Sequence, residues 1–174
     1  MTLTMKLVPL ASHCIDELYC FESDNAAYFE EWVPPRPIAY QSASTLIELV
    51  DQQIGEINNG ANYQMYLAYC GCELIGRFNL TNITTQKAEV GYRIGAGFTG
   101  RGYASAGLRL LFANAKSQQL TELEAYTTAD NVGSQCVLTK VGFSHKDTQV
   151  AAAELNGKLV DLLRFSCHLD TSRA

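Results

Sequence analysis

The sequence predicts a mixed α/β (α+β) sheet formed by a single domain that spans residues 1–174. Helical apolar periods fill the first third of the chain, a period of two takes over at Tyr63, and one strand–helix–strand crossover follows. The expected order is N-terminal helices, an antiparallel meander, a β-α-β crossover, a short helix and a C-terminal hairpin. A chain of 174 residues is the size of one domain, and no linker, repeat or low-complexity run divides it.

The first predicted elements are helices. Ser12 stands where it can cap a helix, and a second helical piece is expected over residues 24–32. The first helix has its apolar positions at Ile15, Leu18, Tyr19 and Phe21. Pro34, Pro35 and Pro37 then stop any helix, because proline lacks a backbone donor and restricts the residue before it.

A longer helix is predicted after this proline segment. Thr45, with Glu48 three residues later, fits a capping box at its start. The helix is expected to end near residues 58–60, and its apolar stripe consists of Leu46, Leu49, Val50, Ile54 and Ile57.

The period of two that begins at Tyr63 predicts an antiparallel hairpin. Residues 63–69 alternate in polarity, residues 70–73 form a turn, and residues 74–81 return as a second strand. A third strand is expected over residues 88–96.

The rest of the chain predicts a crossover and a terminal hairpin. The expected elements are a helix from about residue 103, a strand over 120–127, a short helix over 134–141 and strands over 143–152 and 158–168. Asn156 and Gly157 join the last two strands and are typical of a type I′ turn.

Charge and hydropathy exclude several classes of function. The formal net charge is −5 and the pI about 5.1, which disfavours a nucleic-acid binder. No run of about 18 apolar residues is present, so no membrane partner is expected. Residues 1–10 lack the apolar core of a secretory signal, and a cytoplasmic location is therefore predicted.

The six cysteines and three histidines do not follow the spacing of a zinc site, so no metal is predicted. Together with the absence of an export signal, this indicates reduced thiols, most of them expected to be buried small hydrophobes.

The most informative segment is the glycine-rich loop between the third strand and the following helix. Four glycines in eight residues put bare backbone N–H groups at a helix N-terminus, where they can hold phosphate oxygens; the glycines are Gly95, Gly97, Gly100 and Gly102. The alternative is a turn whose glycines only permit positive φ. A Walker loop is rejected, because Arg101 and Gly102 replace its Lys and Ser/Thr.

A dinucleotide fingerprint also matches this segment in its letters but not in its context. Its acidic residue belongs at the end of the next strand, whereas Glu122 and Glu124 lie at the start and middle of that strand. The antiparallel hairpin upstream does not fit a parallel doubly wound sheet either. A dinucleotide enzyme is therefore disfavoured.

A third register, Thr99-x-x-Gly102-x-Ala104, resembles the pyrophosphate loop of the GCN5-related N-acetyltransferase (GNAT) superfamily. Residues 89–94 followed by residues 100–104 are similar to the Rim-type branch, the ribosomal-protein N-acetyltransferases and their relatives. Three more segments are similar to that branch, namely Asn131-x-x-Ser134 with residues 140–143, residues 25–34, and Asp161 near the last strand. The sequence departs from the pattern at Thr99, Ala106 and Leu138, the last where many members carry a catalytic Tyr.

The resemblance implies acetyl-CoA as co-substrate and assigns roles to specific residues. Its pyrophosphate is expected at the backbone amides of Gly100, Arg101, Gly102, Tyr103, Ala104 and Ser105. Asn131 is expected to contact the pantetheine arm, and Ser134 to protonate the leaving thiolate. We expect the sheet to open around residues 94–97, so that the backbone N–H of Ile94 faces the pantetheine and the developing oxyanion.

Two of these roles have plain structural alternatives. Glu89 is the candidate base, directly or through a water, but it could instead cap the start of a surface strand. Ser134 could equally be the N-cap of the short helix. A covalent role for Cys136 is disfavoured, because no His stands at a convincing partner position.

The predicted function is an acetyl-CoA-dependent N-acetyltransferase that acts on a protein N-terminal α-amine by direct attack in a ternary complex. A small-molecule amine acetyltransferase and a silent acyl-CoA-binding module are the alternatives. Trp32 and Tyr92 are expected to border the acceptor groove, and the acidic composition favours a cationic amine. A homodimer is possible.

Overall fold

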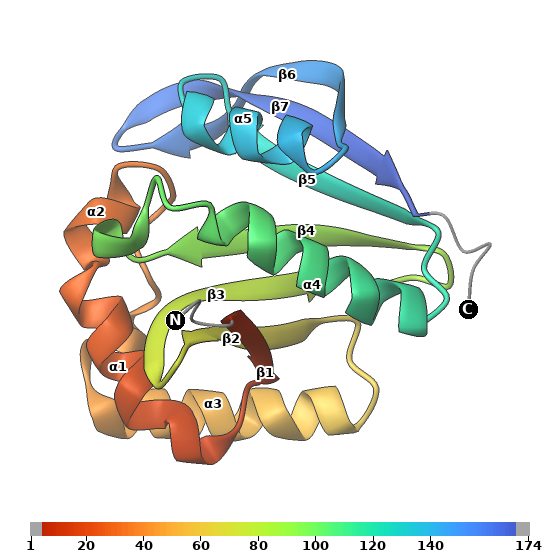
Figure 1. The fold of residues 1–174 in the computed structure, drawn as a ribbon. Coiled ribbons are helices and arrows are strands. Elements are labelled where there is room, and N and C mark those ends of the chain that lie inside the picture. Colours follow the sequence, from red (N-terminus) through yellow and green to blue (C-terminus); the bar gives the residue numbers. More distant parts are fainter. Residues whose placement is uncertain (1–4, 170–174) are drawn as a thin grey trace.

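A computed structural model describes residues 5–169 and places seven strands in one sheet, in the order β1-β2-β3-β4-β5-β7-β6 (Figure 1). The strands are β1 Met5–Pro9, β2 Gln64–Cys70, β3 Glu73–Thr81, β4 Lys87–Ile94, β5 Glu122–Thr128, β6 Ser144–Leu155 and β7 Lys158–His168. The helices are α1 Ile15–Asp24, α2 Ala26–Glu30, α3 Ala43–Asn58, α4 Tyr103–Ser117 and α5 Val132–Lys140. The predicted mixed sheet is confirmed.

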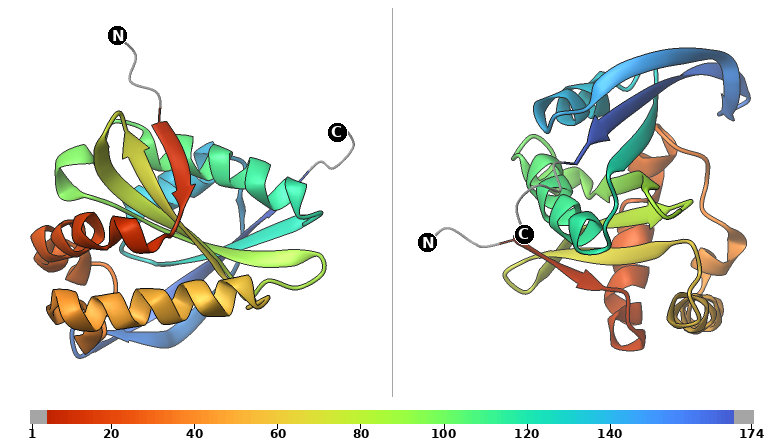
Figure 2. Two further views of the ribbon diagram at one scale, coloured as in Figure 1. Left: turned by 90° about the horizontal axis from the view of Figure 1, so that it is seen from below. Right: turned by 90° about the vertical axis from the view of Figure 1, so that its right-hand side faces the viewer.

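The helices cover both faces of the sheet, as the two further views show (Figure 2). α1 and α3 pack on one face, where Leu18, Leu46 and Val50 meet Leu67 of β2. α4 and α5 pack on the other face, against a larger core that contains Phe78, Leu80, Leu108, Leu111 and Leu138. Alternate residues of β2 therefore serve different cores, Leu67 and Tyr69 the first, Ala68 and Cys70 the second.

The N-terminal third differs from its prediction in three places. β1 was not expected, because a five-residue run that contains a charge and a proline carries no clear period. Ser12 does not cap α1, since its hydroxyl donates to Asp51 Oδ1 at 2.8 Å. The N-cap of α3 is Ser42, whose hydroxyl accepts from the Thr45 N–H, so this helix begins earlier than Thr45.

The predicted strands and the terminal hairpin are confirmed. β2 pairs with β3, β3 with β4, and β6 with β7, all antiparallel. Asn156 and Gly157 have φ of 51° and 72°, the two positive values that a type I′ turn requires. The residue pair therefore ends β6 and starts β7 as its sequence indicates.

β4 and β5 run parallel but separate part-way along their length. Their register pairs only residues 87–90 with residues 122–125. Beyond Val90, β4 follows β3 as far as the Ile94–Gly76 pair, whereas β5 follows β7 as far as the Thr128–Leu162 pair. The prediction that the sheet opens around residues 94–97 is wrong in position, because the strands already part after Val90.

The cysteines also differ from their prediction. No disulfide joins any of the six, but only Cys14 and Cys70 are buried, whereas Cys20, Cys72 and Cys136 are exposed. In the described part of the chain, no helix has the length and apolar character that crossing a bilayer requires.

Candidate active site

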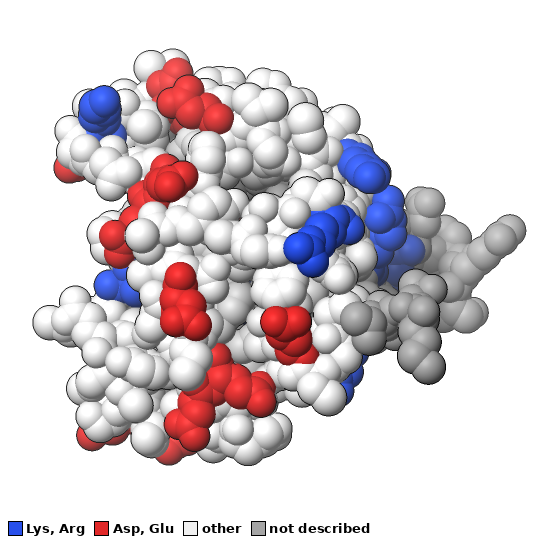
Figure 3. Space-filling model, turned by 60° about the vertical axis from the view of Figure 1, so that its left-hand side comes forward, with Lys and Arg blue, Asp and Glu red and all other residues white. Residues whose placement is uncertain are grey.

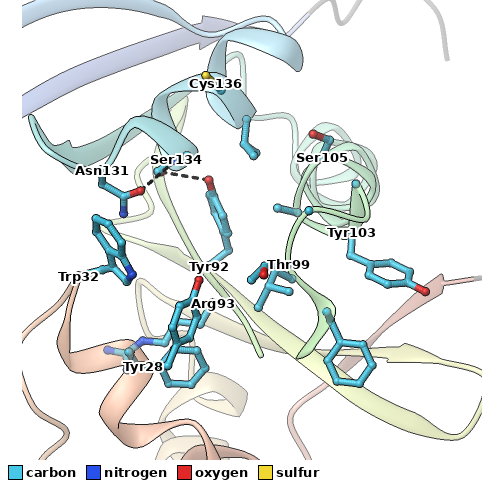
Figure 4. Close-up of a pocket in the computed structure, with 18 of the residues that line it drawn as sticks. Tyr28, Trp32, Tyr92, Arg93, Thr99, Tyr103, Ser105, Asn131, Ser134 and Cys136 are labelled. Carbon is cyan, nitrogen blue, oxygen red and sulfur yellow. Dashed lines mark hydrogen bonds between the residues drawn. The ribbon is translucent and has the colours of Figure 1, made fainter. Parts of the chain in front are cut away.

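The parting of β4 and β5 opens a cleft of about 500 Å³ (Figure 4). Its walls come from the segment around α2, the end of β4, the glycine loop with the start of α4, and the first turns of α5. The predicted site residues that line it are Trp32, Tyr92, Ile94, Gly100, Gly102, Tyr103, Ala104, Ser105, Asn131 and Ser134. Segments far apart in the sequence thus meet at one hollow.

The end of β4 directs backbone groups into this cleft. The Gly95 N–H donates to the Ile75 carbonyl at 3.0 Å, which fixes the phase of the β3–β4 ladder. Because hydrogen-bonded residues alternate in an antiparallel pair, Tyr92 and Ile94 turn their N–H groups away from β3. β5 has already separated there, so these two donors face the cleft.

The glycine loop ends at the N-terminus of α4, a kind of helix end that suits an anion. Gly100 and Gly102 have φ of +72° and +82°, a conformation that side chains other than glycine rarely adopt, and Gly102 is the N-cap of α4. The helical ladder begins with the Ala106 N–H bonding to the Gly102 carbonyl. The first amides of α4 therefore have no partner within the helix and point with its dipole at the cleft.

Asn25 anchors this loop, a contact that the sequence reasoning did not assign. Its Oδ1 accepts from the Ala96 N–H at 2.8 Å, and its Nδ2 donates to the Phe21 carbonyl at 2.8 Å. A Cβ on Gly95 would approach Phe21 within 3.1 Å, so the loop lies tightly against α1. The sequence signal for this contact was Asn25 itself, the first residue of the segment that resembles the Rim-type branch.

Asn131 and Ser134 make different contacts at the start of α5. Asn131 is the N-cap, because its Oδ1 accepts from the Ser134 N–H at 3.0 Å. The alternative in which Ser134 caps this helix is wrong. The Ser134 hydroxyl instead lies 3.1 Å from the Tyr92 hydroxyl (Figure 4), and the Asn131 amide nitrogen turns toward Trp32.

Packing fixes the Tyr92 ring beside Ser134. It stacks on Phe78 with ring centroids 5.8 Å apart, and Gly107 of α4 gives Phe78 its space, since a Cβ there would lie 2.1 Å from the ring. Burial raises the pKa of Tyr92, although the Ser134 hydrogen bond opposes this. The Tyr92 hydroxyl thus keeps its proton at neutral pH and can donate it.

The other end of the cleft is aromatic and carries a guanidinium. Tyr28, Phe29 and Trp32 come from α2 and the segment after it, and Arg93 reaches them from the face of β4 opposite Tyr92. The Arg93 guanidinium lies over the Phe29 ring at 5.2 Å. Arg93 was not predicted as a site residue, because β4 also contains Lys87 and Glu89 and the strand pattern does not single out a third charged residue.

Two predicted residues do not line the cleft. Glu89 is half-buried within β4 and accepts a hydrogen bond from Asn82 Nδ2 at 2.9 Å. Arg101 is exposed and lies over the Phe98 ring at 5.9 Å, beside the glycine loop. The structure therefore gathers the backbone and hydroxyl groups of the predicted site but sets these two charged groups at its margin.

Within residues 5–169, no three His, Cys, Asp or Glu side chains come together as metal ligands.

The cleft thus brings together amide donors at a helix N-terminus, cleft-facing strand amides and a part-buried hydroxyl pair, a combination that suits a phosphate-bearing acyl donor. The family model described as "Acetyltransferase (GNAT) domain" matches residues 5–144. The chain belongs to this GNAT acetyltransferase family and is an N-acetyltransferase. A search of curated protein sequences finds no match.

Solved structures share the fold closely at low sequence identity. RimL, a ribosomal L7/L12 alpha-N-protein acetyltransferase in complex with coenzyme A, is 22% identical with a TM-score of 0.89 over 97% of this chain and 96% of that one. RimJ of Mycobacterium smegmatis in complex with CoA-disulfide is 20% identical with a TM-score of 0.87, covering 98% and 84%. The microcin C7 self-immunity acetyltransferase MccE, in complex with acetyl-CoA and AMP, is 20% identical with a TM-score of 0.85, covering 96% and 98%.

Proposed function

We propose that this protein transfers the acetyl group of acetyl-CoA to a protein N-terminal α-amine. One observation carries the proposal: the Ser134–Tyr92 hydroxyl pair shares a cleft with the free amides of Ile94 and the α4 N-terminus. The likeness to RimL and RimJ supports the choice of acceptor. A single catalytic domain over residues 1–174 is part of the proposal, while a homodimer and a cytoplasmic location stay predictions.

The donor is proposed to lie along the separated end of β4. The amides from Gly100 to Ser105 hold the pyrophosphate, and Arg101 adds positive charge beside them. The Ile94 N–H and the Asn131 Nδ2 bind the pantetheine arm. The thioester then lies next to the Ser134 and Tyr92 hydroxyls.

In the proposed reaction the neutral amine attacks the thioester carbonyl, so that a C–N bond forms and the C–S bond breaks. The Ile94 N–H stabilises the developing oxyanion, because its position is fixed before the charge appears. The Ser134 hydroxyl gives its proton to the leaving thiolate and regains one from solvent after CoA leaves. Tyr92, which its raised pKa keeps protonated, stabilises the transient Ser134 alkoxide by donating a hydrogen bond to it.

The proton of the amine is proposed to reach Glu89 through water. Glu89, Gly91 and Arg93 share one face of β4, and a Cβ at Gly91 would meet no atom within 4 Å. Asn79 lies opposite Gly91, and its buried Oδ1 has no hydrogen-bond partner among the described residues. A buried acceptor of this kind is where an ordered water is expected.

A small-molecule amine is the second candidate acceptor. The likeness to MccE supports it, because that fold matches over nearly the whole of both chains. Trp32 and Tyr28 supply a flat aromatic wall that suits a planar ring as well as a peptide.

The test is thiol release from acetyl-CoA with a panel of N-terminal peptides and small amines. We expect turnover with peptides, and Ser134→Ala or Glu89→Gln slowing it tens-fold or more, against the 10²–10⁴ typical of acid–base groups. Thr139→Ala is the matched control, since this α5 hydroxyl bonds only the Gln135 carbonyl among described groups and lies outside the cleft. Turnover with small amines alone would support the second candidate, and CoA binding with no turnover would support a silent module.

A further inference from the structure

Two arginines donate hydrogen bonds to a buried carboxylate near the acceptor end of the cleft. Glu22 of α1 is 2% exposed, and Arg36 donates to both of its oxygens, at 2.7 and 2.6 Å. Arg77 donates to the same carboxylate at 2.7 Å and to the Tyr40 hydroxyl at 3.1 Å. This arrangement leaves Glu22 with little capacity for a third partner.

A third arginine, Arg93, lies beside this carboxylate. Its Nη1 lies 3.9 Å from Glu22 Oε2, beyond hydrogen-bond distance, and no hydrogen bond from its guanidinium is found within residues 5–169. Its side chain is only 17% exposed. Burial, and next the charge of Arg36, lower the pKa of Arg93 to about 10, so it remains cationic at neutral pH.

The cluster therefore contains three guanidinium groups and one carboxylate. Arg93 lies over the Phe29 ring and 3.9 Å from Glu22, but none of its five N–H donors has a hydrogen-bonded acceptor among the described residues. A largely buried cation in this position gains from a further acceptor. Arg93 lines the cleft and turns toward Tyr28 and Trp32, on the side of Tyr92 away from the glycine loop (Figure 4). The donor's phosphates are served by α4, so Arg93 is available to the acceptor.

We propose that Arg93 pairs with an anionic oxygen group, a carboxylate or phosphate, that the acceptor carries close to its reacting amine. The inference rests on the proposed function and deepens it, since it names the acceptor class as N-terminal peptides with an acidic side chain at the first or second residue. Planar guanidinium groups bind carboxylates in this way through paired hydrogen bonds.

The outer surface does not supply this preference. On the face of Figure 3, acidic side chains are the more numerous over the part with α1 and α2, and basic ones lie mainly at the opposite edge. The net charge of −5 led to an expected preference for cationic acceptors. The recessed Arg93 gives the opposite preference at the point of reaction, where low exposure limits screening by salt.

The first test compares peptide pairs that differ only in charge at the first residue, Asp against Asn and Glu against Gln. We expect the wild-type kcat/KM to favour the acidic peptide by about tenfold or more, the scale of a charge-assisted hydrogen bond. Arg93→Gln should abolish the preference and Arg93→Lys should retain part of it. Lys6→Gln removes the same charge on β1, far from the cleft, and should leave the preference unchanged.

The second test does not depend on turnover. Trp32 is the single tryptophan and lines the cleft, so its fluorescence reports binding of N-acetyl-aspartyl and N-acetyl-asparaginyl peptides. We expect tighter binding of the acidic product by wild type and no difference in Arg93→Gln. Equal binding of both products by wild type, or the same difference in Arg93→Gln, overturns the proposal. Selective binding without acetylation of any peptide would leave it standing and count against the proposed function alone.

Discussion

The two ends of the cleft are built in different ways. The proposed donor end is mainly one continuous segment, residues 94–105, which offers main-chain amides. The proposed acceptor end combines side chains from separate parts of the chain, namely Tyr28 and Trp32 with Arg93. Main-chain donors keep their function when a side chain changes, as at Thr99. At the acceptor end each contact is made by a side chain, so its identity matters. The donor is therefore readable from a motif and the acceptor only from the folded chain.

The largest expected effect is at the support of the acceptor end. Arg77→Gln leaves the buried Glu22 carboxylate with Arg36 as its close partner, so we expect the free energy of unfolding to fall by about 3–5 kcal/mol. Urea denaturation measures it. Arg101→Gln, an exposed cation, is the control and should change the value by no more than about 0.5 kcal/mol. A loss in Arg77→Gln as small as that of the control would contradict this account.

The same ion pairs predict how stability depends on pH. Burial raises the pKa of Glu22, but Arg77 and Arg36 outweigh it, so the pKa lies below its ordinary value of 4.5. A lowered carboxyl pKa contributes stability that is present above pH 4.5 and is lost as the pH falls through the folded value. Wild type should thus lose more stability below pH 4.5 than Arg77→Gln does, as measured by urea titrations at several pH values.

The donor end should respond most to a change in its main chain. Gly102→Val forces a β-branched residue into φ of +82° at the N-cap of α4. This misplaces several of the backbone N–H groups that are proposed to bind the pyrophosphate. We expect acetyl-CoA affinity to fall by about 100-fold, measured by calorimetry, since each such bond contributes about 1.5–3 kcal/mol. Arg101→Gln should lose only a few-fold. The reverse order would mean that side chains, not amides, hold the donor.

A smaller effect is expected at Asn25, which joins the glycine loop to α1. Asn25→Ala removes the hydrogen bonds to Ala96 and Phe21 that tie the loop to α1. Acetyl-CoA affinity should fall by about fivefold to tenfold, the scale of one or two neutral hydrogen bonds. Asn25→Asp keeps the acceptor for the Ala96 N–H but loses the donor to the Phe21 carbonyl, so it should recover only part of the affinity. No change in either variant would show that the loop holds its shape alone.

The smallest effect is expected at Cys136. This exposed thiol lines the cleft on α5, but direct acetyl transfer gives it no step. Cys136→Ala should retain full kcat and kcat/KM in the thiol-release assay. A large loss of kcat would instead favour a covalent acetyl-cysteine route.

For a physical reason, the sequence locates the glycine loop more readily than the aromatic end of the cleft. A glycine loop that starts a helix is a local feature, so Gly100, Gly102 and their neighbours could be assigned without the fold. The Arg93–Glu22 cluster joins residues far apart in the chain, and in a strand pattern Arg93 reads as a solvent-facing position. The predicted position of the split between β4 and β5 was wrong because, beyond Val90, β4 pairs with β3 and β5 pairs with β7. Local periodicity does not encode which neighbour a strand pairs with.

The proposed function requires that backbone amides of residues 94 and 100–105 receive acetyl-CoA. Amide NMR spectra recorded during an acetyl-CoA titration measure this contact residue by residue. We expect large shift changes at Ile94 and from Gly100 to Ser105, while β6 and α3 stay unchanged. Unmoved amides in that segment, or equal changes on addition of NAD, would contradict it.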